Sequence, residues 1–230
     1  MPRTVVDPHL RVQRHPERGV YDRASIEAIL DEALVSHVGF VHGGRPVVIP
    51  TLHARDGDRL YIHGSSASRM LGALADGADL CLTVTLIDGL VLARSAFHHS
   101  ANYRSVVVFG RARPVDDAEE KLHALEVFTE HVMPGRWAEV RPPDARELAT
   151  TSVLAVSLEE ASAKVRTGPP AEDRRDEQRT VWAGVLPLRL EAAAPEPDAG
   201  VPVGLEAPAY LRGYGRARPA RPRASGEVEE

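Results

Sequence analysis

The chain has 230 residues, of which 43% are hydrophobic and 27% charged, with a formal net charge of −5. This composition predicts one globular domain with a buried core, and it gives no overall attraction to nucleic acid or to an anionic membrane. The single cysteine, Cys81, cannot form an internal disulfide and so does not indicate an oxidising compartment. Because the sequence has neither a bilayer-length apolar stretch nor a signal-peptide core, we expect a cytoplasmic protein without a membrane partner.

The first elements predicted along the chain are an arm, a helix and a set of hairpins. Residues 1–20 are polar and basic and are expected to form the arm. Asp22 is expected to cap a helix with Ile26, Ile29 and Leu30 on one face. Short apolar runs separated by Gly and Asp turn signals follow, which predicts antiparallel hairpins. These strands are expected at residues 38–41, 46–52 and 60–62.

The middle of the chain returns to helix and then to strands. A short helix is expected from about Ser66, with Gly77 as its stop. An Asp88-Gly89 pair predicts a tight turn between two of the strands that follow. Those strands are expected at residues 80–86, 90–95 and 105–114.

The last part of the chain combines a longer helix, two strands and a tail. Asp116 and Glu119 predict a capping box for a helix that Pro134-Gly135 ends. Late strands are expected at 152–158 and 182–190. The domain is therefore expected to cover residues 21–194, and residues 195–230, rich in Pro and Arg, to be disordered. Short strands joined mainly by tight turns predict an α+β fold, mainly β, whose antiparallel sheet closes into a barrel.

The segment from Tyr61 to Met70 leads a strand through a Gly-Ser-Ser turn directly onto a helix N-terminus. Unpaired backbone N–H groups and the helix dipole favour an anion at such a position. Ser65 and Ser68 add hydroxyl donors, and Arg69 adds a guanidinium that can grip a phosphate with paired bonds. The alternative is that a serine simply caps the helix and Arg69 is solvated.

Residues 90–105 carry an unusual density of polar and aromatic side chains, which suggests a binding edge. His98 and His99 are adjacent, so on an extended chain they point to opposite faces, and no metal site is predicted. Further on, Lys164 and Arg166 alternate on one face of a strand. That pattern suits a binding role, and it also suits an edge strand charged against aggregation.

An ordered set of motifs runs from about Arg14 to Leu188. The motifs are Tyr21-Asp22-Arg23, residues 37–41, residues 48–51, residues 61–65, Ser68-Arg69, residues 102–106, residues 164–169 and residues 181–185. In order and character they resemble the FMN-binding split-barrel family related to pyridoxamine 5′-phosphate oxidase. The resemblance is closest to the flavin-nucleotide-binding branch, which also contains nitroimidazole-resistance-type proteins.

The resemblance implies a split antiparallel β-barrel with a few peripheral helices, which forms a homodimer with two FMN molecules at the subunit interface. One strand would lie along the flavin ring, the Gly-Ser-Ser turn would hold the ribityl phosphate, and basic and aromatic residues late in the chain would approach the ring. The cofactor-binding residues that it implies are Ile49, Pro50, Thr51, His63, Gly64, Ser65, Ser68, Arg69, Asn102, Tyr103, Ser105, Lys164, Arg166 and Trp182.

The function that the resemblance implies is an FMN-dependent oxidoreductase acting on a small aromatic or nitro-aromatic molecule. The arginine-bearing C-terminal substrate arm of the true oxidases is missing, so oxidation of pyridoxamine phosphate is not expected. Two alternatives remain open. The chain has no nicotinamide-binding Gly-rich fingerprint, which leaves a non-catalytic flavin-binding or sensory protein. Some split barrels bind haem, and His63, His98 or His99 could then be an axial ligand.

Overall fold

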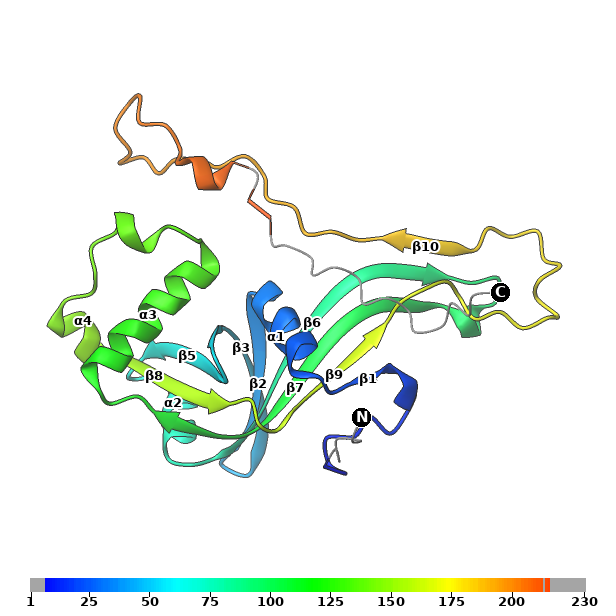
Figure 1. Cartoon of the computed structure of the whole chain (residues 1–230), viewed down its shortest axis with the longest axis horizontal. Helices are drawn as coiled ribbons and strands as arrows, with labels where there is room; N and C mark the ends of the chain where they lie inside the picture. The colour runs from blue at the N-terminus through cyan, green and yellow to red at the C-terminus, as the bar shows by residue number, and fades with distance from the viewer. Residues whose placement is uncertain (1–6, 213, 216–230) are drawn as a thin grey trace. The chain divides into compact units, whose positions relative to one another are not determined.

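The computed structural model describes residues 7–212, 214 and 215, and the chain divides into two compact units, Met1–Arg189 and Leu190–Glu230. The described part of the first unit contains ten strands and four α-helices (Figure 1). The α+β, mainly β fold class predicted from the sequence is confirmed. In the described part of the second unit, the one regular element is a 3-10 turn at Ala209–Leu211. The end of the predicted tail, beyond residue 215, lies outside the described residues.

The sheet follows the strand order β3-β2-β6-β7-β8-β5-β4, with β9 pairing with β7 and β1, and β10 pairing with β6. Because β7 pairs first with β9 and then with β8, the sheet curves round, while β3 and β4 remain its two ends. This open, curved sheet is the predicted split barrel. The strands are β1 (Gly19–Val20), β2 (Val35–His42), β3 (Arg45–Leu52), β4 (Ala54–Asp56), β5 (Arg59–Ser65), β6 (Asp79–Leu92), β7 (Ser100–Pro114), β8 (Thr151–Ser157), β9 (Ala161–Arg166) and β10 (Gly184–Pro187).

The helices are α1 (Arg23–Glu32), α2 (Arg69–Ala75), α3 (Ala118–Val132) and α4 (Ala145–Thr150). Asp22 caps α1 as predicted. Helix α3 begins one residue later than predicted, because Asp117, not Asp116, accepts the N–H of Glu120. Both aspartates precede a glutamate by three residues, so the capping pattern could not distinguish them. None of the described helices is long and apolar enough to cross a membrane.

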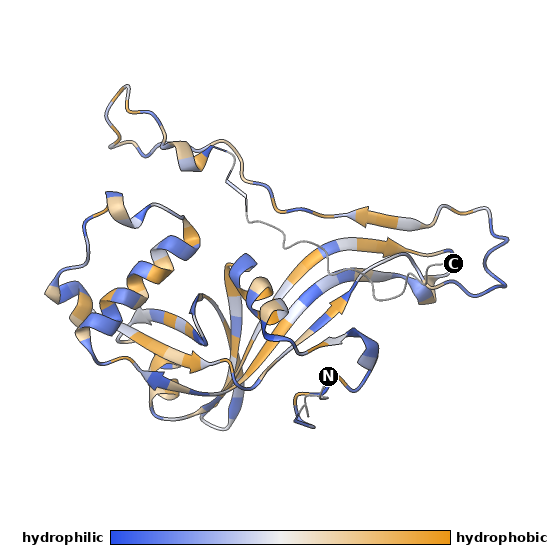
Figure 2. Ribbon diagram, viewed as in Figure 1, coloured by the Kyte–Doolittle hydropathy of each residue, from blue (hydrophilic) through white to orange (hydrophobic). Residues whose placement is uncertain are grey.

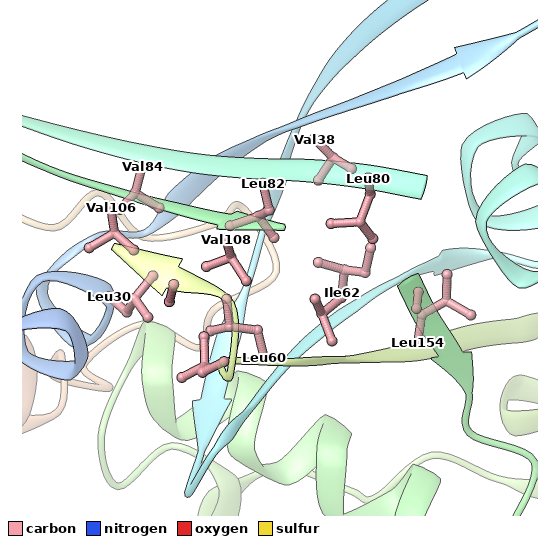
Figure 3. Close-up of a cluster of buried hydrophobic side chains, with 14 of the residues drawn as sticks. Leu30, Val38, Leu60, Ile62, Leu80, Leu82, Val84, Val106, Val108 and Leu154 are labelled. Atoms are coloured by element: carbon pink, nitrogen blue, oxygen red, sulfur yellow. The ribbon is translucent and has the colours of Figure 1, made fainter. Parts of the chain in front are cut away.

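Two apolar clusters lie on opposite sides of β5. Leu60 and Ile62 point into the main core inside the curved sheet (Figure 3), whereas Tyr61 packs with Phe128 of α3 in a second cluster. The alternation of apolar and polar residues along the strands is visible in Figure 2. Since side chains alternate along a strand, His63 is directed to the side of β5 on which α3 lies. The main core also includes Leu30, Val38, Leu82, Val84, Val106, Val108 and Leu154.

Asp88-Gly89 is not the turn that the sequence predicted. Strand β6 runs through these residues, and the hairpin to β7 turns at residues 93–99 instead. The pairing register shifts between Ile87 and Gly89, which marks a β-bulge. A Cβ at Gly89 would lie only 2.9 Å from the carbonyl oxygen of Leu186, because β10 passes close to the bulge. The Asp-Gly pair therefore forms part of a β-bulge, and its glycine allows the backbone of β10 to pass close to β6. It does not reverse the chain.

Arg104 joins the bulge to helix α1. Its guanidinium donates two hydrogen bonds of 2.8 Å to Asp88 and a pair to Glu32, one of them 2.7 Å long. The three side chains are 12–19% exposed. Hydrogen bonds to Glu32 and then to Asp88 raise the pKa of Arg104 above its ordinary value. This ion triad fixes the end of α1 against β6 and β7.

We expect Arg104→Met to lower the free energy of unfolding by about 3 kcal/mol, because it leaves two largely buried carboxylates without their cation. Arg111→Met is the matched control, since Arg111 pairs with Asp79 on the surface and such pairs contribute about 0–1 kcal/mol. Urea unfolding of the two variants and the parent protein measures both changes. Equal losses in the two variants would contradict a structural role for the triad.

Candidate functional site

An apolar cavity of about 550 Å³, broadly open to solvent, lies where α3, α4 and the segment between them face β5. Figure 1 shows these helices covering the end of the sheet that β5 and β8 form. The volume is within the range of about 300–1,000 Å³ that is typical of cofactor pockets. The lining residues are Leu52, His63, Leu125, Phe128, Thr129, Val132, Met133, Arg136, Trp137, Val140, Arg141, Pro143 and Glu147.

His63 is the one histidine among the described residues that line this cavity. Its ring packs edge-on against Phe128, with 4.1 Å between the ring centroids. Its Nδ1 atom is buried and has no hydrogen-bond partner in the described structure. Burial lowers the pKa of His63 below its ordinary value, so the imidazole is neutral at pH 7. A neutral imidazole with a free lone pair is the form that binds a metal ion.

Polar contacts at both ends of α3 hold the helix over the sheet. Near the start of the helix, the Nε2 atom of His123 lies 2.8 Å from the carboxylate of Asp56 on β4. Near its end, His131 donates a 2.9 Å hydrogen bond from Nε2 to the carbonyl oxygen of Ala33, just after α1. The wall of the cavity that carries Phe128 is thereby fixed relative to β5.

The segment after α3 is fixed by the carboxylate of Glu130. It accepts the backbone N–H of Gly135 at 2.6 Å and that of Trp137 at 2.8 Å. These two bonds hold the turn that places Arg136 and Trp137 at the cavity. Because the carboxylate binds backbone groups, this geometry depends little on the side chains that follow it.

Two arginines lie at the opening of the cavity. Their side chains are 46% exposed for Arg136 and 66% exposed for Arg141, whereas Phe128 deeper in the cavity is 4% exposed. Arg136 donates a 3.0 Å hydrogen bond to Glu139. Arg141 forms a paired contact with Glu147, with distances of 2.9 and 2.8 Å. The cavity therefore has an apolar interior and a charged rim.

Several residues in the predicted flavin site come together on β7 and β9. Tyr103 lies opposite Arg166, and Ser105 lies opposite Lys164, so these four share one face of the sheet. Asn102 accepts a hydrogen bond from Arg166, and the Ser105 hydroxyl donates to the carbonyl oxygen of Lys164 at 3.3 Å. These polar contacts order the group before any ligand is bound.

The same face continues across the sheet to β3. The register places Pro50 opposite His37 of β2, then Thr83 of β6 and Val107 of β7. Pro50 therefore shares the outward face with the group on β7 and β9, as the predicted site requires. Ile49 instead packs against the main core, on the opposite face of β3.

The predicted phosphate-binding turn uses its own polar groups. The Ser68 hydroxyl caps α2 by accepting the N–H of Leu71 at 3.4 Å. The Ser65 hydroxyl accepts the N–H of Ala67 at 3.2 Å. Arg69 is exposed, and no ion pair to it occurs in the described part of the chain. A phosphate contact from Gly64 to Arg69 stays a prediction.

Trp182 and the histidine pair lie away from these groups. Trp182 is 66% exposed and lies two residues before β10, which pairs with β6, whereas Lys164 and Arg166 belong to β9 on the far side of β7. His98 and His99 lie at the tip of the β6–β7 hairpin, where His98 is 3.4 Å from Asp173. Of the three histidines considered as axial ligands, only His63 lines the cavity.

The cavity wall beyond α3 is not predicted from the sequence. The pattern predicts α3 as an amphipathic helix, and it predicts no helix at α4, where Asp144 and Glu147 form a capping box. One signal was present: residues 134–143 combine three prolines with Trp137, Arg136 and Arg141. Such a loop exposes an aromatic side chain and two cations next to an apolar helix, which is typical of a binding wall.

The model of the pyridoxamine 5′-phosphate oxidase family matches residues 22–165. The chain is 41% identical to the flavocytochrome Anf3 from Azotobacter vinelandii, with 92% of this chain and 98% of that chain covered and a TM-score of 0.86. It is 36% identical to the FAD and haem binding protein from Mycobacterium smegmatis, with 86% and 98% covered and a TM-score of 0.83.

A protein proposed to confer 5-nitroimidazole antibiotic resistance in Bacteroides thetaiotaomicron VPI-5482 shares the fold, at 24% identity and a TM-score of 0.55. Its match covers 64% of this chain and 86% of that chain. The comparison with curated proteins gave no match. Because the family model covers more than half of the chain, and two relatives above 30% identity match most of it, the protein belongs to the pyridoxamine 5′-phosphate oxidase family, the flavin-binding family that its motifs predict.

Proposed function

We propose that this protein is a redox protein that binds both flavin and haem, with the haem in the cavity at His63. The observation that carries the proposal is a neutral imidazole without a hydrogen-bond partner in the wall of an apolar cavity of cofactor size. The two relatives that match nearly their whole length support it, since one is a flavocytochrome and the other binds FAD and haem. Haem binding, an alternative from the sequence alone, becomes part of the leading proposal.

The residues of the cavity fit a haem group. Leu125, Phe128 and Val132 offer apolar walls for the macrocycle, and His63 offers a nitrogen for the iron. Haem and flavin, when bound, supply the redox chemistry, and the protein supplies position and electrostatics. Phe128 holds the imidazole ring by its edge contact, and burial keeps the ring unprotonated.

We propose that the flavin lies on the outward face of the sheet, between two copies of the chain. Large apolar side chains on this side of the domain are exposed, among them Val41 by 62%, Val48 by 64% and Ile87 by 47%. A second copy would remove them from water and would bring its own β3 to the polar group on β7 and β9. In place of the FMN predicted from the motifs, we propose FAD, because the haem-binding relative at 36% identity binds FAD.

An oxidoreductase function is part of this proposal. The nitro-aromatic substrate suggested by the motifs stays a prediction, since the likeness to the 5-nitroimidazole resistance protein supports the fold alone. A non-catalytic flavin-binding role is the second candidate. Consumption of NADH or NADPH by the purified protein, with oxygen or a nitro-aromatic acceptor, separates the two.

His63→Ala is expected to remove the haem while leaving the flavin bound. The purified parent protein should show a Soret band together with flavin absorption, and the variant should lose roughly tenfold or more of its haem, because the side chain that would bind the iron is gone. His42→Ala is the matched control, since His42 is exposed at the end of β2 and should keep both cofactors. A parent protein without a Soret band, or a variant that retains its haem, would contradict the assignment.

The haem-free chain should lose stability in acid through His63. Its pKa is below 6.5 in the folded state, so as the pH falls below about 6.5 the unfolded chain binds a proton that the folded chain does not. Between pH 8 and pH 5, His63→Leu should therefore lose less unfolding free energy than the parent chain. A His63→Leu profile parallel to that of the parent chain would overturn the prediction.

Val48→Asp is expected to convert a dimer into a monomer of about 25 kDa and to release the flavin, because it places a charge in the proposed apolar interface. Light scattering reports the mass, and mass spectrometry of the released flavin separates FAD from FMN. Asp58→Asn, in the exposed turn between β4 and β5, is a suitable control for a surface change. A monomeric parent protein with flavin still bound would refute the shared site.

A further inference from the structure

We propose that Arg136 and Arg141 bind the two propionate carboxylates of the haem at the cavity opening, where each arginine exchanges a surface glutamate for a propionate. The inference rests on the proposed haem-binding function and assigns it two anchoring residues outside the predicted site. It concerns the charged rim of the cavity rather than the iron ligand.

Both arginines lie at the opening of the cavity, where the propionates of a bound haem would be expected. Both line the cavity, and both are far more exposed than the apolar residues of its interior. A haem whose iron meets His63 and whose macrocycle contacts Phe128 would direct its polar edge to the open side of the cavity, because burying a carboxylate in an apolar interior is costly. The arginines stand on that open side.

The charges of the residues that line the cavity also favour propionate binding by the two arginines. Among the described residues that line the cavity, Arg136 and Arg141 are the only ones with a positive charge at pH 7, since His63 is neutral. A guanidinium can bind a carboxylate through two parallel hydrogen bonds. Two such groups match the two carboxylates of one haem.

The glutamate that each arginine contacts is itself a surface residue. The pairs Arg136–Glu139 and Arg141–Glu147 are both on the surface, with side chains 45–66% exposed. The single-bond pair of Arg136 contributes about 0–1 kcal/mol, whereas the two-bond pair of Arg141 with Glu147 is the stronger of the two. A propionate on a haem already held by the iron and the apolar walls has a high effective concentration beside the arginines, which favours exchange.

The local structure survives the exchange. Glu147 also accepts the backbone N–H of Asp144 in the capping box of α4, so it keeps a partner when Arg141 turns to a propionate. Arg136 follows a turn that Glu130 fixes through backbone groups. Substitution of either arginine is therefore not expected to disturb the cavity wall.

Titration of the full-length, haem-free chain with haemin, followed by the Soret band, tests the proposal. Arg136→Gln and Arg141→Gln should each weaken haemin binding by about tenfold, because each removes one charge-assisted contact. Haemin dimethyl ester lacks the propionate charges and should bind the parent chain and both variants equally. Arg111→Gln removes an exposed, ion-paired arginine on β7 and serves as the matched control.

Variants that bind haemin as tightly as the parent chain, or that lose haemin and its dimethyl ester to the same extent, would overturn the proposal. Urea unfolding midpoints equal to that of the parent chain exclude general damage. If His63→Ala abolishes haemin binding while the arginine variants do not weaken it, the haem function stands and the propionate assignment fails. If the parent chain binds neither haemin nor the ester, the haem function itself fails.

Discussion

The burial of β5 on both faces is the constraint from which the site follows. Leu60 and Ile62 pack in the main core, and Tyr61 between them packs in the second cluster with Phe128 of α3. A strand with two buried faces cannot shift by one residue without exchanging the two clusters. His63 is consequently held on the α3 side, against Phe128 and at the wall of the cavity.

A buried imidazole nitrogen without a partner has a cost in the folded chain, on the order of 1–3 kcal/mol for an unsatisfied polar group. The surrounding structure sustains this cost, because α3 is anchored at both ends and the turn after it is held by Glu130. The cavity is thus organised before binding, which limits the conformational entropy lost when a rigid ligand enters.

The second proposed site has different requirements. The polar group on β7 and β9 is ordered within one chain, but it lies on an outward sheet face that also presents exposed apolar side chains. The triad of Arg104, Glu32 and Asp88 supports this region from inside, where α1 meets the bulge of β6. Leu52, which follows the predicted flavin strand residues, lines the cavity at His63, so the two proposed sites adjoin at the end of β3.

The sequence by itself determined the fold class, the cap of α1, the alternation of the barrel strands and the family, because each depends on local pattern or on ordered motifs. It also identified His63 as a residue of interest. Two features were decided only by the tertiary structure. The approach of β10 accompanies the bulge at Asp88-Gly89, and the packing of α3 and α4 against β5 forms the cavity. Both depend on segments far apart in the chain, whose contacts no local pattern encodes.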